Sequence, residues 1–292
     1  PPPNTPAFVP AAPHPAAAAA PTGGLTARNP AELATARKAA VEVVKSVGVN
    51  VLRGKDLTTV TFPVRCTEGK TALEKIADAM GFAGAYLDGA AEMVGVEGEG
   101  RAVAIERMKA VMAFYVASLH LVSGFCLKPL NPTLGETYSA ELLPTSSSSS
   151  PTTIHMEQIS HHPPVASYLV RGSGSTPNSR WQYHGNMAYS ASFGLNEVRI
   201  APSGSRVFTF SPPAPGLAPQ KITLAVPADT FSGVMWGSYA HNTTGIAEFV
   251  DAANGLRGEL RFGRPKGTVE RSLAAQLPDR GDTVVGGVWG KV

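Results

Sequence analysis

The chain has few cysteines, little charge and no cluster of basic residues. Its two cysteines, Cys66 and Cys126, lie far apart and form no Cys-x-x-Cys pair. This spacing excludes a disulfide framework and a cysteine-rich zinc site, and it indicates a reducing, cytoplasmic compartment. Charged residues make up 16% of the 292 residues, and the net charge is +3. So weak a charge argues against nucleic acid as a partner, whereas peripheral contact with an anionic membrane stays compatible with it.

Signatures of enzymes and of metal sites are also missing. The sequence contains no Gly-x-Ser-x-Gly, and the glycines of GVEGEG (95–100) are not in the order of a dinucleotide-binding loop. Ser160 and His161 are adjacent, which is poor geometry for a nucleophile and its base. His155 could join His161 and His162 around a metal, but adjacent histidines rarely bind one ion from regular structure. We therefore expect no catalysis, no metal and no cofactor.

One apolar stretch, between Lys109 and Lys128, approaches the length of a membrane-spanning helix. Spanning requires about 20 apolar residues, and here His120, Ser123 and Gly124 interrupt the run. We predict a buried helix of a large soluble domain.

The first half of the chain predicts helices. Residues 1–24 form a Pro/Ala-rich tract that cannot build a core, and we expect a disordered tail. Asn29 and Pro30 then provide a helix start, and Gly48 provides a stop. The run 56–64 alternates and predicts a short strand. Further helices are expected from a capping box at Thr71-x-x-Glu74, over 85–93, and over 102–123.

After Lys128 the pattern changes to short apolar or alternating runs, separated by Gly, Pro, Ser and Asn. Such spacing predicts an antiparallel sheet or barrel over residues 127–292, after a helical part over 29–123. The Ser-rich residues 145–151 are expected to form a loop. The predicted strands are TYSAELL, TIHMEQI, VASYLV, WQYHGNMAY, EVRI, RVFTF, KITLAV, VMWGSY, IAEFV and LRGELRF.

The stretch EQISHHPP (157–164) contains two adjacent histidines followed by two prolines. Neighbouring side chains of a regular strand point to opposite faces, so His161 and His162 could not then serve one ligand. Pro163 and Pro164 remove two ladder donors, which predicts that the strand ends here or runs along a sheet edge. Taken alone, the histidines could be surface residues at a strand end.

A second unusual stretch is LKPLNPTLGETY (127–138), which follows the predicted buried helix. Pro129 and Pro132 stiffen the chain and would hold Lys128 and Asn131 in place at the mouth of the β array. Taken alone, this stretch could be a simple connector from helix to strand.

Together, the two stretches supply hydrogen-bond donors without an obligatory carboxylate. Lys128 offers a charged ammonium, Asn131 an amide N–H, and His161 and His162 ring N–H groups. Such a set indicates an anion site, and phosphate is the obvious ligand because it would favour the charged form of the histidines.

Both stretches resemble hallmarks of one family, the oxysterol-binding protein-related lipid-transfer proteins. EQISHHPP resembles the family signature, which usually has valine where this chain has Ile159. KPLNPTLGETY (128–138) resembles the family's upstream hallmark, and the resemblance runs from about GKDLTTVTFPV (54–64) to the end of the sequence.

The resemblance implies a mainly β fold with N-terminal helices: an antiparallel, nearly closed β-barrel with a lipid tunnel and a lid. It implies binding of phosphatidylinositol 4-phosphate and its exchange between membranes, at endoplasmic reticulum contact sites, for a sterol or another lipid such as phosphatidylserine. A lipid sensor or scaffold without transfer activity is the alternative. By this resemblance, the headgroup residues are Lys128, the backbone of Leu130, Asn131, His161 and His162.

This sequence departs from the family at its C-terminal end, because the family domain continues beyond the last strand predicted near GGVWGKV (286–292). We therefore expect residues 25–292 to form a truncated lipid-binding domain with an incomplete barrel. An incomplete barrel would expose a strand edge and apolar surface, so transfer by this chain does not follow from the resemblance.

Overall fold

The computed structural model describes residues 26–27, 29–48, 64, 67–93, 100–122, 127–144, 150–176, 178–212, 216–262, 273–277 and 282–287. The Pro/Ala-rich tract 1–24 and most of the strand predicted over 56–64 lie outside these residues. The helices are α1 (Pro30–Val47), α3 (Ala72–Ala79), α4 (Ala83–Glu92) and α5 (Gly100–Val122).

The helix starts predicted from capping residues are confirmed. The Asn29 side chain accepts hydrogen bonds from the backbone N–H groups of Ala31 and Glu32, at 3.0 and 3.4 Å, and α1 ends before Gly48, which has φ +82°. At α3, Thr71 and Glu74 form the reciprocal capping box. These contacts satisfy N–H groups that have no partner within a helix.

The long helix α5 is the helix predicted over 102–123. Its residues Ala104, Met108 and Val111 are at most 1% exposed, so it is buried as expected. Among the described residues, none of the helices combines the length and the apolar character that crossing a membrane requires.

Arg107 on α5 is fully buried, and it joins α5 to the end of α4. Its guanidinium donates hydrogen bonds to the carbonyls of Ala90, Ala91 and Met93, at 3.0, 3.3 and 3.0 Å, and to that of Ser211 at 2.8 Å. Three of these acceptors are the last carbonyls of α4 and its cap, which lack partners within the helix. Burial lowers the pKa of Arg107 to about 10, so it remains charged at neutral pH.

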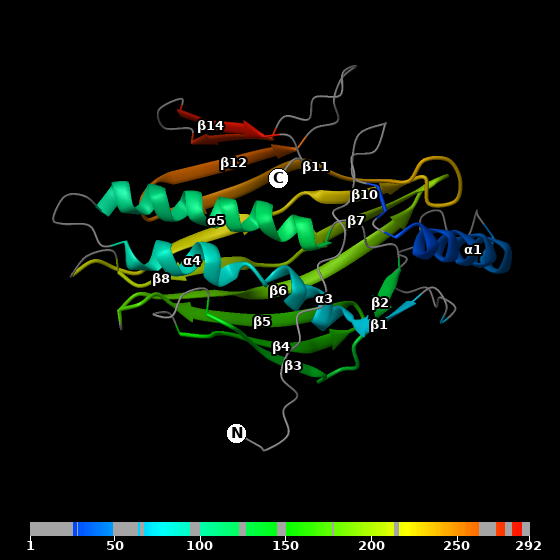
Figure 1. Cartoon of the computed structure of the whole chain (residues 1–292), viewed down its shortest axis with the longest axis horizontal. Coiled ribbons are helices and arrows are strands. Elements are labelled where there is room, and N and C mark those ends of the chain that lie inside the picture. The colour runs from blue at the N-terminus through cyan, green and yellow to red at the C-terminus, as the bar shows by residue number, and fades with distance from the viewer. Residues whose placement is uncertain are drawn as a thin grey trace.

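The main sheet is antiparallel, and most of its strands pair with the next strand along the chain (Figure 1). The interpretation as a mainly β fold with N-terminal helices is confirmed. Within the described residues, β3 and β14 are the two ends of the sheet and do not pair with each other. The strands are β3 (Thr137–Leu142), β4 (Thr152–His161), β5 (Pro164–Ser173), β6 (Arg180–Phe193), β7 (Glu197–Ser203), β8 (Arg206–Phe210), β9 (Gln220–Ala225), β10 (Ala228–Ser232), β11 (Ala240–Asp251), β12 (Leu256–Phe262), β13 (Leu273–Leu277) and β14 (Asp282–Gly287).

At two places in the sheet, two short strands together occupy the position of one long strand. β7 and β8 both pair with β6, one after the other, and β10 and β9 pair in the same way with β7 and β8 on one side and with β11 on the other. The break between β7 and β8 lies opposite Gly185, where a side chain would overlap the carbonyl of Ser205. Glycine is therefore required at this position of β6.

One predicted strand is wrong and several were missed. VMWGSY (234–239) is a loop rather than a strand, and the strand nearby is β10, just before it. The loop is held by Asn196, whose side chain accepts from the N–H groups of Met235 and Trp236. A short parallel pair, β1 (Thr67–Thr71) with β2 (Lys128–Leu130), was also not predicted. The strand expected over 286–292 overlaps β14 only at its first two residues, and the rest lies outside the described residues.

Helices α3, α4 and α5 lie across one face of the sheet, which we call the inner face (Figure 1). In several strands every second residue is buried toward this face, for example Ala166, Tyr168 and Val170 on β5. Tyr183 stacks on Phe208 with ring centroids 4.1 Å apart, and the Trp181 indole N–H donates to Asp88 on α4 at 2.7 Å. The core therefore joins helices to sheet by aromatic packing and a few buried polar contacts.

Candidate functional site: the turn between β4 and β5

The histidine pair lies where β4 ends and β5 begins. His161 is the last residue of β4 and pairs with Pro164, the first residue of β5, as predicted from the prolines. The register shifts between Gln158 and Ser160, which leaves Ile159 without a cross-strand partner. Such a bulge turns the following side chains relative to the sheet.

The two histidine rings contact each other instead of pointing to opposite faces. Their centroids are 4.6 Å apart, with 74° between the ring planes. His161 is half-buried, and His162 is exposed. One small ligand at this turn could therefore contact both rings, which a regular strand would not permit.

The second motif lies directly against the first. The ring nitrogen Nδ1 of His161 is 3.2 Å from the carbonyl oxygen of Pro132. Because a carbonyl can only accept, this contact requires the proton on Nδ1, and it leaves Nε2 for a ligand.

Backbone hydrogen bonds also join the two motifs. The N–H of Gly135 donates to the carbonyl of Gln158, and the N–H of Gln158 donates to the carbonyl of Glu136, both at 2.9 Å. The loop turns sharply here, with Gly135 at φ +78°, and Thr133 donates its N–H to the Glu136 carboxylate at 3.0 Å. The loop 131–136 is thus fixed on the end of β4.

The structure places the five predicted headgroup residues on these two neighbouring segments. Lys128 and Leu130 belong to β2, so Lys128 sits in a short strand and not in the stiff turn that we expected. Leu130 is 41% exposed, Asn131 is exposed, and Asn131 precedes the proline whose carbonyl contacts His161. A role of the five residues in binding a headgroup remains a prediction.

Sequence reasoning missed the residues that hold this site together. The carbonyl of Pro132 and the backbone of Gln158 and Gly135 form the connection, and backbone groups carry no residue-type signal. The buried side chain of Gln158 donates to the carbonyl of Ser160 at 2.8 Å. A glutamine at an inward position of β4, next to the histidines, was the one available hint.

The third histidine considered for a metal site has a partner of its own. The Nδ1 of His155 is 3.1 Å from the Ser139 hydroxyl. Among the described residues, no group of three or more His, Cys, Asp or Glu side chains is arranged to hold a metal ion. The histidine pair therefore has a backbone carbonyl as its fixed partner.

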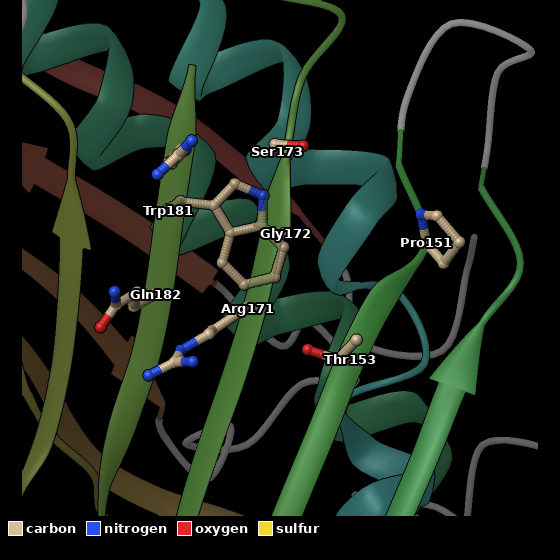
Figure 2. A pocket seen from close by; sticks show the side chains of 8 residues that line it. Pro151, Thr153, Arg171, Gly172, Ser173, Trp181 and Gln182 are labelled. Atoms are coloured by element: carbon tan, nitrogen blue, oxygen red, sulfur yellow. The ribbon is translucent and has the colours of Figure 1, made fainter. Parts of the chain in front are cut away.

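A hollow on the described surface lies elsewhere (Figure 2). It has a volume of about 460 Å³ and lies at the end of β5 and the start of β6, far along the strands from the histidines. Thr153, Arg171 and Gln182 form one cross-strand row there. Since none of the five predicted headgroup residues lines it, it is a separate feature.

Comparison with solved structures gives the class of fold. The oxysterol-binding-related domain (ORD) of Osh1 in complex with cholesterol matches with a TM-score of 0.63 and 24% identity, over 82% of this chain and 51% of that chain. The ORD of Osh3 from Saccharomyces cerevisiae, in complex with PI(4)P, matches with a TM-score of 0.63 and 17% identity, over 94% and 66%. The fold is therefore that of an ORD.

Sequence comparison gives the family. The family model of the oxysterol-binding proteins matches residues 48–291. Oxysterol-binding protein 9 of Dictyostelium discoideum is 34% identical over 241 residues, which cover 82% of this chain and 50% of that protein. Oxysterol-binding protein-related protein 5 of Homo sapiens is 26% identical over 209 residues, covering 72% and 22%.

This chain belongs to the oxysterol-binding protein family, as the two motifs predicted. It spans about half the length of the Dictyostelium relatives that it matches.

Proposed function

We propose that this chain binds phosphatidylinositol 4-phosphate at the turn between β4 and β5, and exchanges it between membranes for a sterol or another lipid. Lys128, the backbone of Leu130, Asn131, His161 and His162 hold the inositol phosphates. The lipid-binding domain comprises residues 25–292, with residues 1–24 as a tail. Binding involves no chemical step and no cofactor.

The observation that carries this proposal is the contact between His161 and the Pro132 carbonyl. It joins the two donor-rich motifs, although 29 residues separate the two partners in sequence. The Osh3 ORD binds PI(4)P and the Osh1 ORD binds cholesterol, which gives the ligand classes to test.

Apolar side chains surround the site and support contact with a membrane. Leu130, Leu134 and Ile159 are 41%, 67% and 45% exposed, all within a few residues of the proposed headgroup contacts. Exposed apolar residues beside cationic donors suit the surface of an anionic bilayer. The chain would act peripherally, at contact sites of the endoplasmic reticulum.

The test is binding of a soluble phosphatidylinositol 4-phosphate analogue to the purified chain, measured by calorimetry. The double variant H161A/H162A should lose roughly 100-fold in affinity, because each charge-assisted hydrogen bond contributes about 1.5 kcal/mol. H155A is the matched control: an exposed histidine on the same strand that should bind as wild type does. Equal binding by the double variant and by H155A would contradict the assigned site.

Transfer needs a separate measurement, because a sensor or scaffold would also bind. A fluorescent sterol should move between vesicles faster when the acceptor vesicles contain phosphatidylinositol 4-phosphate. Binding without transfer would favour the sensor, and transfer of phosphatidylserine instead of the sterol would identify the other carrier.

A further inference from the structure

The hollow of Figure 2 gathers polar side chains from three neighbouring strands of the sheet. Thr153 on β4, Arg171 on β5 and Gln182 on β6 are cross-strand partners and form one row. Val170 is buried toward the inner face, and successive side chains of a strand point to opposite faces. The row therefore lies on the outer face of the sheet, which we define as the face opposite the helices.

The side chains that line this hollow supply hydrogen-bond donors and include no carboxylate. Arg171 and Arg180 each contribute a guanidinium, Gln182 contributes an amide, and Thr153 and Ser173 contribute hydroxyls. The volume of about 460 Å³ is in the range of small-molecule sites. Because a guanidinium can donate two parallel hydrogen bonds to one oxyanion, the hollow suits an anionic group.

The cationic character of the hollow depends mainly on Arg171. This side chain is exposed, and no described carboxylate forms an ion pair with it. The same row contains one acid, Glu141 on β3, which pairs with Thr153. In the other direction the row reaches Lys221 on β9 through Thr209 on β8, so cations outnumber the acid along it.

Backbone hydrogen bonds fix the strand end at the hollow before any ligand binds. The N–H of Arg180 donates to the Ser211 hydroxyl at 2.9 Å, and the N–H of Ser211 donates to the Arg180 carbonyl at 2.8 Å. The Glu92 carboxylate, which lies beside the turn between β5 and β6, accepts from the Ser175 hydroxyl at 2.7 Å. That acid is therefore already engaged, and the fixed backbone lowers the cost of ordering the site.

We propose that this hollow binds a phosphate monoester, with Arg171 as its main cation and with Thr153, Gln182 and Arg180 around it. Phosphate suits the hollow better than a planar carboxylate does, because its three terminal oxygens can accept from donors on three different strands. The site goes beyond the proposed function and does not depend on it. Thr153 is near the start of β4, whereas His161 is at the end of the same strand.

The phosphate could belong to a soluble ester or to a phospholipid headgroup, and three related probes separate these sources. The probes are glycerol, glycerol 3-phosphate and dihexanoyl phosphatidate. They are titrated into the variant H161A/H162A, so that the proposed phosphoinositide site does not contribute. The indole N–H resonance of Trp181, which lines the hollow, reports binding by NMR. Trp236, in the loop 234–239, is the internal reference.

We expect glycerol 3-phosphate to shift the Trp181 resonance and to bind about tenfold or more tightly than glycerol. Tighter binding of the phosphatidate than of glycerol 3-phosphate would identify a lipid headgroup as the source. Equal or weaker binding of the phosphatidate would identify a soluble ester. Either result supports the phosphate site.

Three further substitutions in the same variant locate the site. R171Q should weaken glycerol 3-phosphate about tenfold, because it removes a charge-assisted hydrogen bond. R171K keeps the charge but loses the paired donors of a guanidinium, so it should weaken binding about fivefold. R199Q is the matched control, because Arg199 is an exposed arginine of β7 that does not line the hollow, and it should bind as its parent does.

Equal binding of glycerol and glycerol 3-phosphate would overturn this site. Equal losses in R171Q and R199Q would also overturn it, since they would reflect the overall charge of the chain. Both results leave the proposed phosphoinositide binding intact, because that binding is tested separately at the histidine turn. Failure of the phosphoinositide test, in turn, would not affect the hollow.

Discussion

Two buried arginines, Arg107 and Arg206, differ in the hydrogen-bond partners that surround them. Arg107 donates to the carbonyls of Ala90, Ala91, Met93 and Ser211, and its guanidinium lies 5.2 Å from the Phe210 ring centroid. Arg206 instead donates to the side-chain hydroxyl of Tyr189. Arg107 is therefore held by backbone carbonyls in the interior, whereas the partner of Arg206 is a side chain that solvent reaches.

The largest effect on stability should come from replacing Arg107, which donates hydrogen bonds to four backbone carbonyls. R107M leaves buried carbonyls at the end of α4 without donors, so we expect the free energy of unfolding to fall by about 3–5 kcal/mol. Chemical denaturation followed by circular dichroism measures it. A loss below about 1 kcal/mol would show that Arg107 does not join α4 to α5.

The next effect concerns Gly185, which pairs with Arg206. In G185A the new methyl group meets the Ser205 carbonyl, and we expect a loss of about 2–3 kcal/mol from overpacking. G135A is the control, because Gly135 also has a positive φ but nothing lies within 4 Å of its added Cβ. That variant should lose about 1 kcal/mol from backbone strain alone. Equal losses would show that β8 can move away from Gly185.

R206M should change stability in the opposite direction to R107M. Arg206 is buried and forms no ion pair with a described carboxylate, so replacing it by an apolar side chain should leave the free energy of unfolding unchanged or raise it by about 1 kcal/mol. Thermal unfolding of the ligand-free chain is the measurement. A loss like that of R107M would make Arg206 a structural residue.

The smallest effect concerns Asp88, a buried carboxylate with one oxygen bonded to Trp181 and the other, Oδ2, without a partner. Burial raises its pKa, so the folded state holds the proton more tightly than the unfolded state does. Stability from this group is therefore lost as pH rises through the raised pKa. D88N should remove this dependence of the free energy of unfolding on pH, and it should raise that free energy by less than about 1 kcal/mol at pH 7. Denaturation at several pH values from 4 to 7 measures both. The same pH dependence in D88N and in the wild type would show that Asp88 is not its source.

The sequence predicted those features that depend on neighbouring residues. Asn29 and Gly48 bound α1, Thr71 and Glu74 start α3, and the prolines after His162 end β4. Each of these signals acts over a few residues, so one sequence is enough to detect it. The two segments of the candidate site could be recognised for the same reason, because each is a continuous stretch of sequence. Their role in binding a headgroup remains a prediction.

Features that depend on distant strands could not be predicted. RVFTF (206–210) was recognised as the strand β8, but its pairing with Gly185 depends on a break in the sheet opposite β6. VMWGSY resembled a strand by its apolar residues and became a loop because Asn196, about 40 residues earlier, binds its backbone. Tertiary contacts override local propensity in both places.

The order of the strands in the sheet has a consequence for how the chain folds. Most strands pair with the strand that precedes them along the sequence, so pairing requires mainly local loop closure. During synthesis the helices leave the ribosome first, and each new hairpin can extend an edge already formed. Tyr168, Gly185 and Arg206 come together when β8 adds to β6, so this part of the inner face can form before the later strands of the sheet join it.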